Sequence, residues 1–387
     1  MQSSTVLISG ASIGGPALAY WLAEYGFEVT VVERAPAFRP GGQAIDVRGP
    51  ALEVAERMGV LDELRSLATD MRGMSMVDAT GKELYRSTEG TISGGEFATP
   101  DVEILRDDLC QVLFRAAADR VEYLFDDSIV ALAQDAQGVH VTFENADPRT
   151  FDLVVGADGL HSNTRRLAFG PESEYITHLG TYLSVFTAPN YLELDRWQVW
   201  HQGGTAGGAI MTARGNAEIR VFAGFEAPEP VDYDYRDTEA QKKLVHDRLS
   251  DVGWEFPRAL QYMWDAPDFH FDSMSQIHLD QWWRGRVVLV GDAGYCGSPM
   301  SGQGTSMAMV GAYVLAGELK AAHGDHRIAY PAYQDALRGY VAENQQLALT
   351  NKARIAAETG AAQGEAIADI EVQDFGQVVN GLVLKDY

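Results

Sequence analysis

Two glycines and one acid near the start of the chain have the types and spacing that would hold a nucleotide. Gly10 allows a tight turn after an apolar run, and Gly15 lets a helix and a strand approach closely because it has no Cβ. The first N–H groups of a following helix would point at a pyrophosphate. A carboxylate at Glu33 would accept hydrogen bonds from an adenosine ribose. These residues predict a dinucleotide-binding site.

The elements that must position these residues are a strand, a helix and a second strand. Residues 5–9 and 27–33 are strand-like, and residues 16–25 are helix-like. Ser12 stands where a second glycine is usual, and a serine is small and can donate a hydrogen bond. An ordinary strand-to-helix turn is the alternative interpretation. The other residues that we expect around the nucleotide are Ile13, Gly14 and Arg34.

Two later segments repeat this arrangement, with a polar residue directly after an apolar strand. Asp158 follows the run at residues 153–156, and a second acid, Asp292, follows the run at residues 287–290. In open α/β sheets, ligands bind at the carboxyl ends of such strands. Each Asp-Gly or Gly-Asp pair alone is a commonplace turn, but together, in this order, they predict one cofactor site. The turn after the second acid supplies Pro299, Gly302, Gln303 and Gly304.

Composition limits the classes of protein that the chain can be. With 387 residues and 46% apolar content, it is long enough for two domains or for one large domain with an insertion. The net charge of −25 argues against nucleic acid and anionic membrane surfaces as partners. No apolar run approaches the roughly 18 residues of a membrane span, and no leader-like segment precedes the first strand. We expect a cytoplasmic protein that is a monomer or a weak dimer.

The cysteines and histidines do not have the spacing of a metal site. Cys110 and Cys296 are far apart in the chain, and neither is part of a Cys-x-x-Cys pair. His323 and His326 follow an apparent helix end, where a solvated loop is the preferred interpretation. We therefore predict neither a disulfide nor a bound metal ion.

Taken together, the three motifs match a known family. The chain resembles the flavin-dependent aromatic monooxygenases related to para-hydroxybenzoate hydroxylase over nearly its whole length, with the motifs in the family's order. The resemblance implies that FAD is bound, that Asp292 binds its ribityl chain and that the turn after Pro299 faces the isoalloxazine. It also implies that Arg106 contacts FAD and that Asp158 lies on the cofactor side. A helix beginning near Gly304 would stabilise negative charge on the pyrimidine edge of the flavin.

The local composition of the sequence and the resemblance to the family together predict the fold and the division of the chain into domains. The fold class is α/β: a Rossmann-like FAD-binding domain with an inserted antiparallel β-sheet substrate domain and C-terminal helices. We expect a discontinuous FAD-binding domain at residues 1–174 and 269–350, a substrate domain at residues 175–268 and a C-terminal helix or tail at residues 351–387. Most tryptophans lie in or just after the substrate domain, which suits a planar ligand and suits ordinary sheet packing equally well.

Within the family, three segments look most like the tetracycline-inactivating monooxygenases. By that likeness Arg39 would contact NADPH, Asp46 would lie beside FAD, and Arg196 would face the substrate. Where those enzymes place a glutamine and a histidine on the drug, a rough alignment puts Val185 and Arg220. The safer prediction is a planar phenolic or polyketide-like substrate, and a solvated strand face is the alternative for the arginines. The substrate residues that we expect are Arg48, Val185, Arg196, Arg220 and Phe222.

The reaction implied by the resemblance uses O₂ and a transient reductant, NADPH or NADH. Reduced FAD adds O₂ to give a C4a-hydroperoxide, which transfers its distal oxygen to an electron-rich carbon of a small aromatic substrate. A base that deprotonates a phenol would assist, and His201, Tyr182 and Tyr295 are weak candidates that the sequence does not rank.

Three other functions are alternatives to an aromatic monooxygenase. A flavin-dependent halogenase lacks support because the Trp-x-Trp-x-Ile-Pro signature is missing, and Trp197 and Trp200 have the wrong spacing for it. A flavoprotein that binds a ligand without turnover would have the same cofactor motifs. A dehydrogenase using NAD would need the first motif only.

Overall fold

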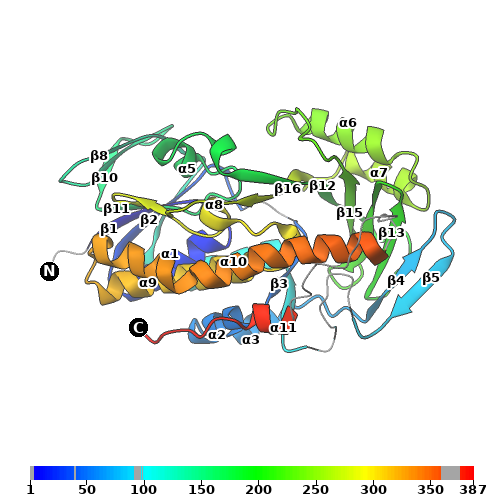
Figure 1. Cartoon of the computed structure of the whole chain (residues 1–387), viewed down its shortest axis with the longest axis horizontal. Coiled ribbons are helices and arrows are strands. Elements are labelled where there is room, and N and C mark those ends of the chain that lie inside the picture. Colours follow the sequence, from blue (N-terminus) through cyan, green and yellow to red (C-terminus); the bar gives the residue numbers. More distant parts are fainter. Residues whose placement is uncertain (1–3, 39–40, 91–96, 98, 359–374) are drawn as a thin grey trace.

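The computed structural model describes residues 4–38, 41–90, 97, 99–358 and 375–387. Arg39, the predicted contact to NADPH, lies outside these ranges. The molecule is elongated, with the N-terminal strands at one end and the strands of a second large sheet at the other (Figure 1). The predicted α/β class is confirmed, since helices pack on a mostly parallel sheet at the first end and a largely antiparallel sheet forms the second.

The first sheet brings together the strands that precede all three predicted motifs. The carboxyl ends of β1, β11 and β18 lie at one edge because these strands are parallel neighbours. Their almost entirely apolar sequences are typical of strands that are buried on both faces. Within the described residues, the order across the sheet is β17 (Trp283–Arg284), β18 (Val287–Leu289), β11 (Leu153–Gly156), β1 (Thr5–Ser9), β2 (Glu28–Glu33) and β7 (Glu122–Phe125).

Alternate residues of β1 face two different layers. Val6 and Ile8 pack in the core that includes helix residues, whereas Leu7 packs in a separate core with a small antiparallel sheet. The helical layer comprises α1 (Gly14–Glu24), α4 (Arg106–Ala117) and α9 (Gly304–Ala321), and the small sheet comprises β8 (Ile129–Gln134), β9 (Val139–Phe143) and β10 (Arg149–Phe151). This layering fixes β1 and β11 rigidly, and with them the turns at their ends.

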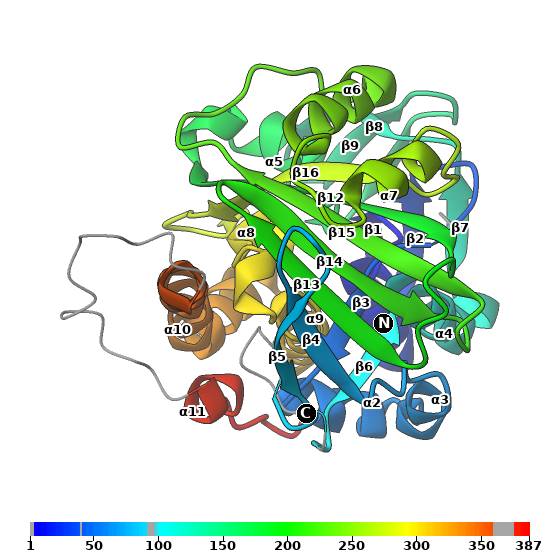
Figure 2. The same ribbon diagram turned by 90° about the vertical axis from the view of Figure 1, so that its right-hand side faces the viewer.

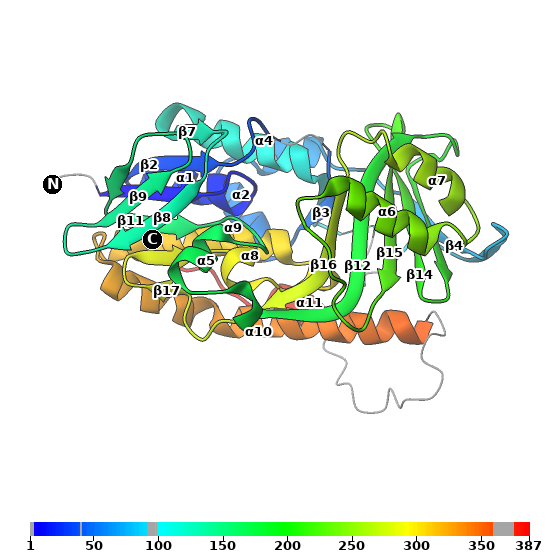
Figure 3. The ribbon, with the colours of Figure 1, turned by 90° about the horizontal axis from the view of Figure 1, so that it is seen from above.

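The second large sheet has one face covered by two helices and the other turned toward the rest of the molecule (Figures 2 and 3). Three of its strands, β16, β4 and β5, lie outside the range 175–268 that we predicted for the substrate domain. The division into domains stays a prediction. In spatial order the sheet contains β16 (His270–Ile277), β12 (Ile176–Pro189), β15 (Glu218–Glu226), β14 (Ala206–Ala213), β13 (Trp197–Gly203), β4 (Gly73–Val77) and β5 (Glu83–Ser87), and the helices are α6 (Thr238–Leu249) and α7 (Phe256–Met263).

A short antiparallel pair, β3 (Ala44–Val47) with β6 (Val102–Leu105), lies between the two large sheets (Figure 3). Gly49 precedes α2 with a φ of 52°, and a Cβ there would meet the Val379 carbonyl oxygen at 2.4 Å. The C-terminal segment therefore passes close to this pair. The remaining short helices are α2 (Pro50–Arg57), α3 (Leu61–Ser66), α5 (Asn163–Ala168), α8 (Asp292–Tyr295) and α11 (Phe375–Val379).

The helix α10 (His326–Glu358) runs along the molecule from the first sheet toward the second (Figure 1). Near its far end, Asn351 donates to the Met300 carbonyl oxygen at 2.9 Å and Lys352 donates to the Leu179 carbonyl oxygen at 2.5 Å. The helix is continuous across position 350, where we predicted a boundary. In the part of the chain that the structure describes, no helix has the length and apolar character needed to cross a membrane.

Candidate cofactor and substrate site

The turn after β1 needs glycine at two positions. Gly10 has a φ of 105°, and a Cβ at this position would lie 2.5 Å from the Ala157 carbonyl oxygen at the end of β11. A Cβ at Gly15 would lie 1.9 Å from the Gly10 carbonyl oxygen. The two glycines therefore let the first turn of α1 sit directly over the ends of β1 and β11. Ile13 is the N-cap residue and makes no side-chain cap within the described chain, so the amide N–H groups of this turn are available to an anion.

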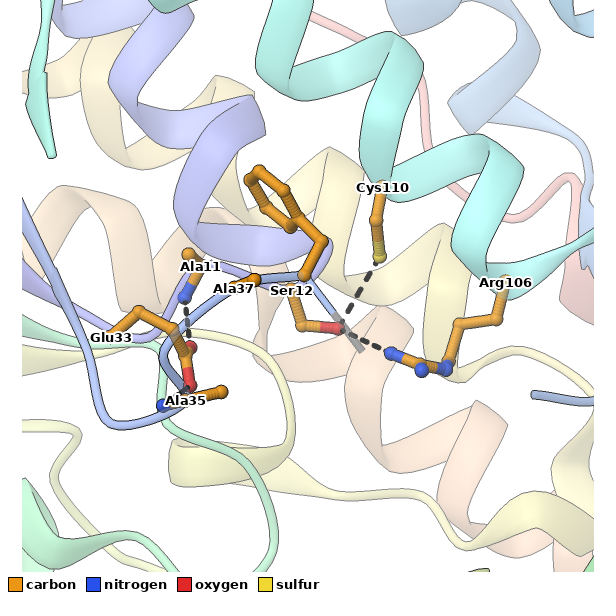
Figure 4. Close-up of a pocket in the computed structure, with 8 residues that line it drawn as sticks. Ala11, Ser12, Glu33, Ala35, Ala37, Arg106 and Cys110 are labelled. Atoms are coloured by element: carbon orange, nitrogen blue, oxygen red, sulfur yellow. Dashed lines mark hydrogen bonds between the residues drawn. The ribbon is translucent and has the colours of Figure 1, made fainter. Parts of the chain in front are cut away.

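Glu33 lies at the carboxyl end of β2, beside this turn (Figure 4). Its two carboxylate oxygens accept hydrogen bonds from the backbone N–H groups of Ala11 at 2.8 Å and Ala35 at 2.9 Å. Arg34, the next residue, is exposed. The carboxylate is thus held at the wall of a pocket, where a ribose hydroxyl can reach it. The pocket is lined by Ala11, Ser12, Glu33, Ala35, Ala37, Phe38, Arg106 and Cys110.

Ser12 and Arg106 meet on the opposite wall of the same pocket (Figure 4). The Ser12 Oγ lies 3.5 Å from Arg106 Nη1 and 3.6 Å from Cys110 Sγ. Arg106 begins α4, so a guanidinium, a hydroxyl and the N-terminal end of α1 converge on one point. These three features can bind a pyrophosphate together.

The Asp158 carboxylate is engaged in hydrogen bonds within the protein at the end of β11. It accepts hydrogen bonds from the Thr164 N–H and Oγ1, both at 2.8 Å, and from the Ser9 Oγ at 3.3 Å. A fourth donor is the Ser162 hydroxyl. The carboxylate therefore fixes the turn that faces Gly10, and its effect on a bound cofactor would be indirect.

The turn between β18 and α9 is strained and contains a buried acid. Gly302 has a φ of 65°, and Ser298, which is not a glycine, has a φ of 73°. Burial, together with the charge of Asp272, raises the pKa of Asp292 at the end of β18. Gly304 is the first residue of α9, which follows the short helical turn begun by Pro299. The strained turn therefore places the N-terminal end of a long buried helix beside an acid.

Gln303 has no exposed surface, yet neither its Oε1 nor its Nε2 has a hydrogen-bond partner among the described residues. A buried amide without partners costs stability unless a ligand satisfies it. Gln303 is the N-cap residue of α9. A ring with carbonyl oxygens and N–H groups, such as the pyrimidine part of a flavin, would match both atoms.

Arg48, directly after β3, reaches the same turn from the other side. Its side chain is 5% exposed and pairs with Asp46, with 3.0 Å between Nη2 and Oδ2. Its Nη1 has no hydrogen-bond partner among the described residues, and it lies 3.3 Å from the place where a Cβ on Gly302 would be. Its guanidinium also lies 5.4 Å from the ring centre of Phe375 in α11. The residues that the structure brings together thus fit FAD at both ends of the cofactor.

One face of the second sheet carries three of the five predicted substrate residues. Val185 and Phe222 are direct cross-strand partners in β12 and β15, so their side chains share a face. Two positions away on β15, Arg220 is on this face as well and donates from Nε to the Gly42 carbonyl oxygen at 2.9 Å. Gly42 lies two residues before β3, and Arg48 directly after β3 lies against Gly302. This face is therefore turned toward the turn from Pro299 to Gly304, which we call the proposed flavin turn. The same register adds Met74, Met76, Thr187, Gln198, Trp200, Ala209 and Met211 to this face, which we call the inner face.

Two of the three predicted substrate arginines, Arg220 and Arg196, are paired within the protein, and the third, Arg48, lies against Gly302 instead of on the second sheet. Arg220 Nη1 lies 2.9 Å from Glu218 Oε1. Arg196 lies just before β13, with a φ of 48°, and its Nη1 lies 2.8 Å from Asp70 Oδ2. Arg196 is therefore at the end of the sheet, and a substrate group would have to compete with these carboxylates.

Comparison with known proteins decides the family. A family model described as FAD binding domain matches residues 3–348. A protein named flavin-dependent monooxygenase from Legionella longbeachae is 39% identical over 344 residues, covering 88% of this chain and 87% of its own length. This chain belongs to the FAD-dependent monooxygenases. An uncharacterized protein of Mycobacterium tuberculosis is 51% identical to this monooxygenase over 383 residues, covering 99% of this chain and all of its own length. The crystal structure of tetracycline destructase Tet(51) superposes with a TM-score of 0.88 at 36% identity and covers 100% of both chains.

None of the three predicted base candidates reaches the inner face of the monooxygenase. His201 points to the helix-covered face, with its ring nitrogens 2.9 Å from the Val77 carbonyl oxygen and 3.1 Å from that of Val252. Tyr182 is on that face too, stacked on Phe271. Tyr295 is buried in the first core, where burial raises its pKa to about 12. In a strand, side chains alternate between faces, so neighbours such as Trp200 and His201 point in opposite directions.

Two groups at the site of the monooxygenase were not found by sequence reasoning. Phe375 comes from α11, and no local pattern links that helix to Arg48. Glu103 in β6 faces Asp46 directly, because the two are cross-strand partners. The signal for Glu103 was present in the sequence: an acid lies between the apolar residues Val102 and Ile104 in a short strand-like run.

Proposed function

We propose that this monooxygenase uses O₂ and NADPH or NADH to hydroxylate a planar phenolic or polyketide-like molecule. Bound FAD would supply oxygen activation through a flavin C4a-hydroperoxide. The protein would contribute positioning and exclusion of water.

The observation that carries the proposal is the inner face of the second sheet. Its side chains are mainly apolar, aromatic or thioether groups, which bind flat apolar molecules well. Val185 and Ala209 are buried, whereas Phe222, Trp200 and Met76 retain part of their exposure and remain accessible to a ligand. The face is joined to the loop before β3 by the hydrogen bond from Arg220 to Gly42. A substrate on this face would lie between the sheet and the flavin ring.

The proposed cofactor contacts divide into two ends. Glu33 would accept the ribose hydroxyls, while Ser12, Arg106 and the N-terminus of α1 would bind the pyrophosphate. At the ring end, Gln303 and Arg48 would satisfy the oxygen and nitrogen atoms of the pyrimidine edge. Asp292 would meet the ribityl chain.

The substrate class is supported by the inner face and by one relative of known structure. Tet(51) is a tetracycline destructase, and tetracyclines are therefore the first polycyclic compounds to test. Val185 and Arg220 stand where a rough alignment places a glutamine and a histidine of the tetracycline-inactivating enzymes. Related phenolic polyketides therefore belong in the same panel. The NADPH contact at Arg39, the monomer or weak dimer and the cytoplasmic location stay predictions.

The test is a product screen of the FAD-loaded protein with NADPH, NADH, O₂ and a panel of tetracyclines, anthraquinones and simple phenols. We expect substrate-dependent oxidation of the nicotinamide and a product heavier by one oxygen atom in mass spectrometry. Ligand binding without oxidation of the nicotinamide would favour a binding protein. A halogenated product in the presence of chloride or bromide would favour a halogenase.

A further inference from the structure

A group of three acids surrounds Arg48 beside the proposed flavin turn. Asp46 in β3 and Glu103 in β6 are cross-strand partners on the same face of the pair. Asp101, just before β6, lies with its Oδ2 3.4 Å from Arg48 Nε. We call Asp46 and Glu103 the carboxyl pair. Asp46 and Asp101 thus pair with a single guanidinium, whose charge also acts on Glu103.

Such an arrangement favours retention of a proton. The side chains of Asp46 and Asp101 are 20% and 19% exposed, so water screens their charges weakly. Burial and the charge of Asp46 raise the pKa of Glu103 to about 7. Burial also raises the pKa of Asp46, against the opposing effect of Arg48. Facing carboxylates at close range do not ionise independently.

Among the residues that the structure describes, the groups that pack around the carboxyl pair supply little further charge. From the segment after α3, Thr69 donates its hydroxyl to Glu103. From α9, the Ser306 Oγ accepts the Arg48 N–H at 3.0 Å. The charged residues of α3 pair with other groups at the surface, Asp62 with Arg65 and Glu63 with Arg115. The charge on the pair is therefore controlled mainly by Arg48 and Asp101.

Arg48 also has one edge without a hydrogen-bond partner among the described residues. Its Nη1 lacks a partner among the described residues and lies 3.3 Å from the place of a Cβ on Gly302, the residue before Gln303. An acceptor oxygen placed at this edge would draw on the same guanidinium that stabilises the ionised carboxyl pair. It would also remove water from around the acids. Both effects make ionisation of the pair less favourable.

We propose that Asp46 and Glu103 share one proton and that binding of the electron-rich edge of the flavin ring at Arg48 is coupled to uptake of that proton. The proton comes from water or buffer and forms an O–H bond on one carboxylate oxygen, with no change of oxidation state. Glu103 acts through Arg48 and is a positioning residue in this account. The inference rests on the proposed cofactor contacts of Arg48 and Gln303.

The test is calorimetric titration of the full-length, flavin-free protein with FAD from about pH 6 to pH 9, in two buffers that differ in ionisation enthalpy. We expect net proton uptake near the pKa of about 7 at Glu103. At pH values above this pKa, the Kd for FAD is expected to rise by up to about tenfold per pH unit. ADP occupies only the Glu33 and Arg106 end, so its binding takes up no proton.

Two variants remove one member of the pair each, Glu103→Gln and Asp46→Asn. Both variants are expected to lose proton uptake and to give an FAD affinity that varies little with pH. If one variant fails to fold, the other still tests the inference. Glu28→Gln, at an exposed glutamate of β2, is the matched control and keeps the wild-type behaviour. FAD binding without proton uptake in the wild type, or uptake that persists in both variants, overturns the inference alone. Failure to bind FAD overturns the proposed cofactor contacts as well.

Discussion

At the scale of single residues, the site is marked by buried polar atoms that have no hydrogen-bond partner in the described part of the chain. Arg48 lies against Gly302 and Gln303 is the next residue of the same turn, and each has hydrogen-bonding atoms with no partner among the described residues. Such groups lower the stability of the empty protein and raise its affinity for a ligand that satisfies them. Glu33 differs, because backbone N–H groups hold its carboxylate in place.

The Gln303→Leu variant separates these two effects. Removal of the partnerless amide should raise the melting temperature of the flavin-free protein or leave it unchanged, since leucine has a similar volume and no polar atoms. FAD binding should weaken by about tenfold or more, the equivalent of about 1.4 kcal/mol for each tenfold step. Differential scanning fluorimetry and fluorescence titration measure the two quantities. A variant that is both less stable and unchanged in FAD affinity would assign Gln303 to the core alone.

The Glu33→Gln variant tests the ribose end of the site. The neutral amide keeps the shape but loses charge-assisted hydrogen bonds worth about 1.5–3 kcal/mol. The Kd for FAD should therefore rise by about 10- to 100-fold, while Glu28→Gln in the same strand leaves it unchanged. Equal affinities for the two variants in a fluorescence titration would contradict the assignment of Glu33 to the ribose.

At the scale of elements, local patterns predicted the motifs well and side-chain direction poorly. The turn from Gly10 to Gly15 and the strand before Asp292 follow from short-range rules of periodicity and glycine geometry. The direction of a side chain in β13 depends on register, and a shift of one residue exchanges Trp200 for His201 on the inner face.

The sequence also did not predict which strands pair over long distances in the chain. The last two strands of the second sheet, β4 and β5, join it through parallel pairing of β4 with β13, more than 120 positions later in the chain. Nothing near residues 73–87 indicates that partner. The same holds for α11, since Phe375 reaches Arg48 only through the tertiary fold.

The last residues of the chain are predicted to stabilise α9. The ring of Tyr387 lies on Gly317, where a Cβ would meet it at 2.1 Å, and its hydroxyl donates to Glu318 Oε1 at 2.8 Å. Tyr387→Phe removes only the hydrogen bond and should lower the free energy of unfolding by about 1 kcal/mol. Tyr387→Ala also removes the ring and should lower it by about 2–3 kcal/mol. Urea unfolding measures both values, and two equal losses would show that the ring contact contributes nothing.

At the scale of the whole molecule, polar contacts join the two large sheets. Arg214, in the turn between β14 and β15, pairs with Asp107 at 2.7 Å and with Asp108, both at the start of α4. On the other side, the His161 ring lies between Glu172, 2.8 Å from Nδ1, and Asp272 of β16, 3.1 Å from Nε2. These contacts set the position of the inner face relative to the flavin turn.

The bridge at His161 gives a predicted pH dependence of stability. Burial opposes its charge, but hydrogen bonds and charges from Asp272 and Glu172 prevail and raise its pKa from 6.5 to about 10. Because the folded pKa is the higher one, the stabilisation is complete below pH 6.5 and is lost as the pH rises to about 10. His161→Gln should be less stable than wild type at pH 6.5, and the difference should shrink toward pH 10. Urea unfolding at a series of pH values tests this, and a difference that is constant with pH would contradict it.

The most direct test of the monooxygenase account is to follow one oxygen atom. The FAD-loaded protein is incubated with NADPH, isotope-labelled O₂ and a compound that stimulates NADPH oxidation, and the product is analysed by mass spectrometry. The account predicts one labelled oxygen atom in the product and loss of its formation in Gln303→Leu at flavin concentrations that saturate only the wild type. A product without label, or hydrogen peroxide as the sole product formed from O₂ with every compound that binds, would contradict it.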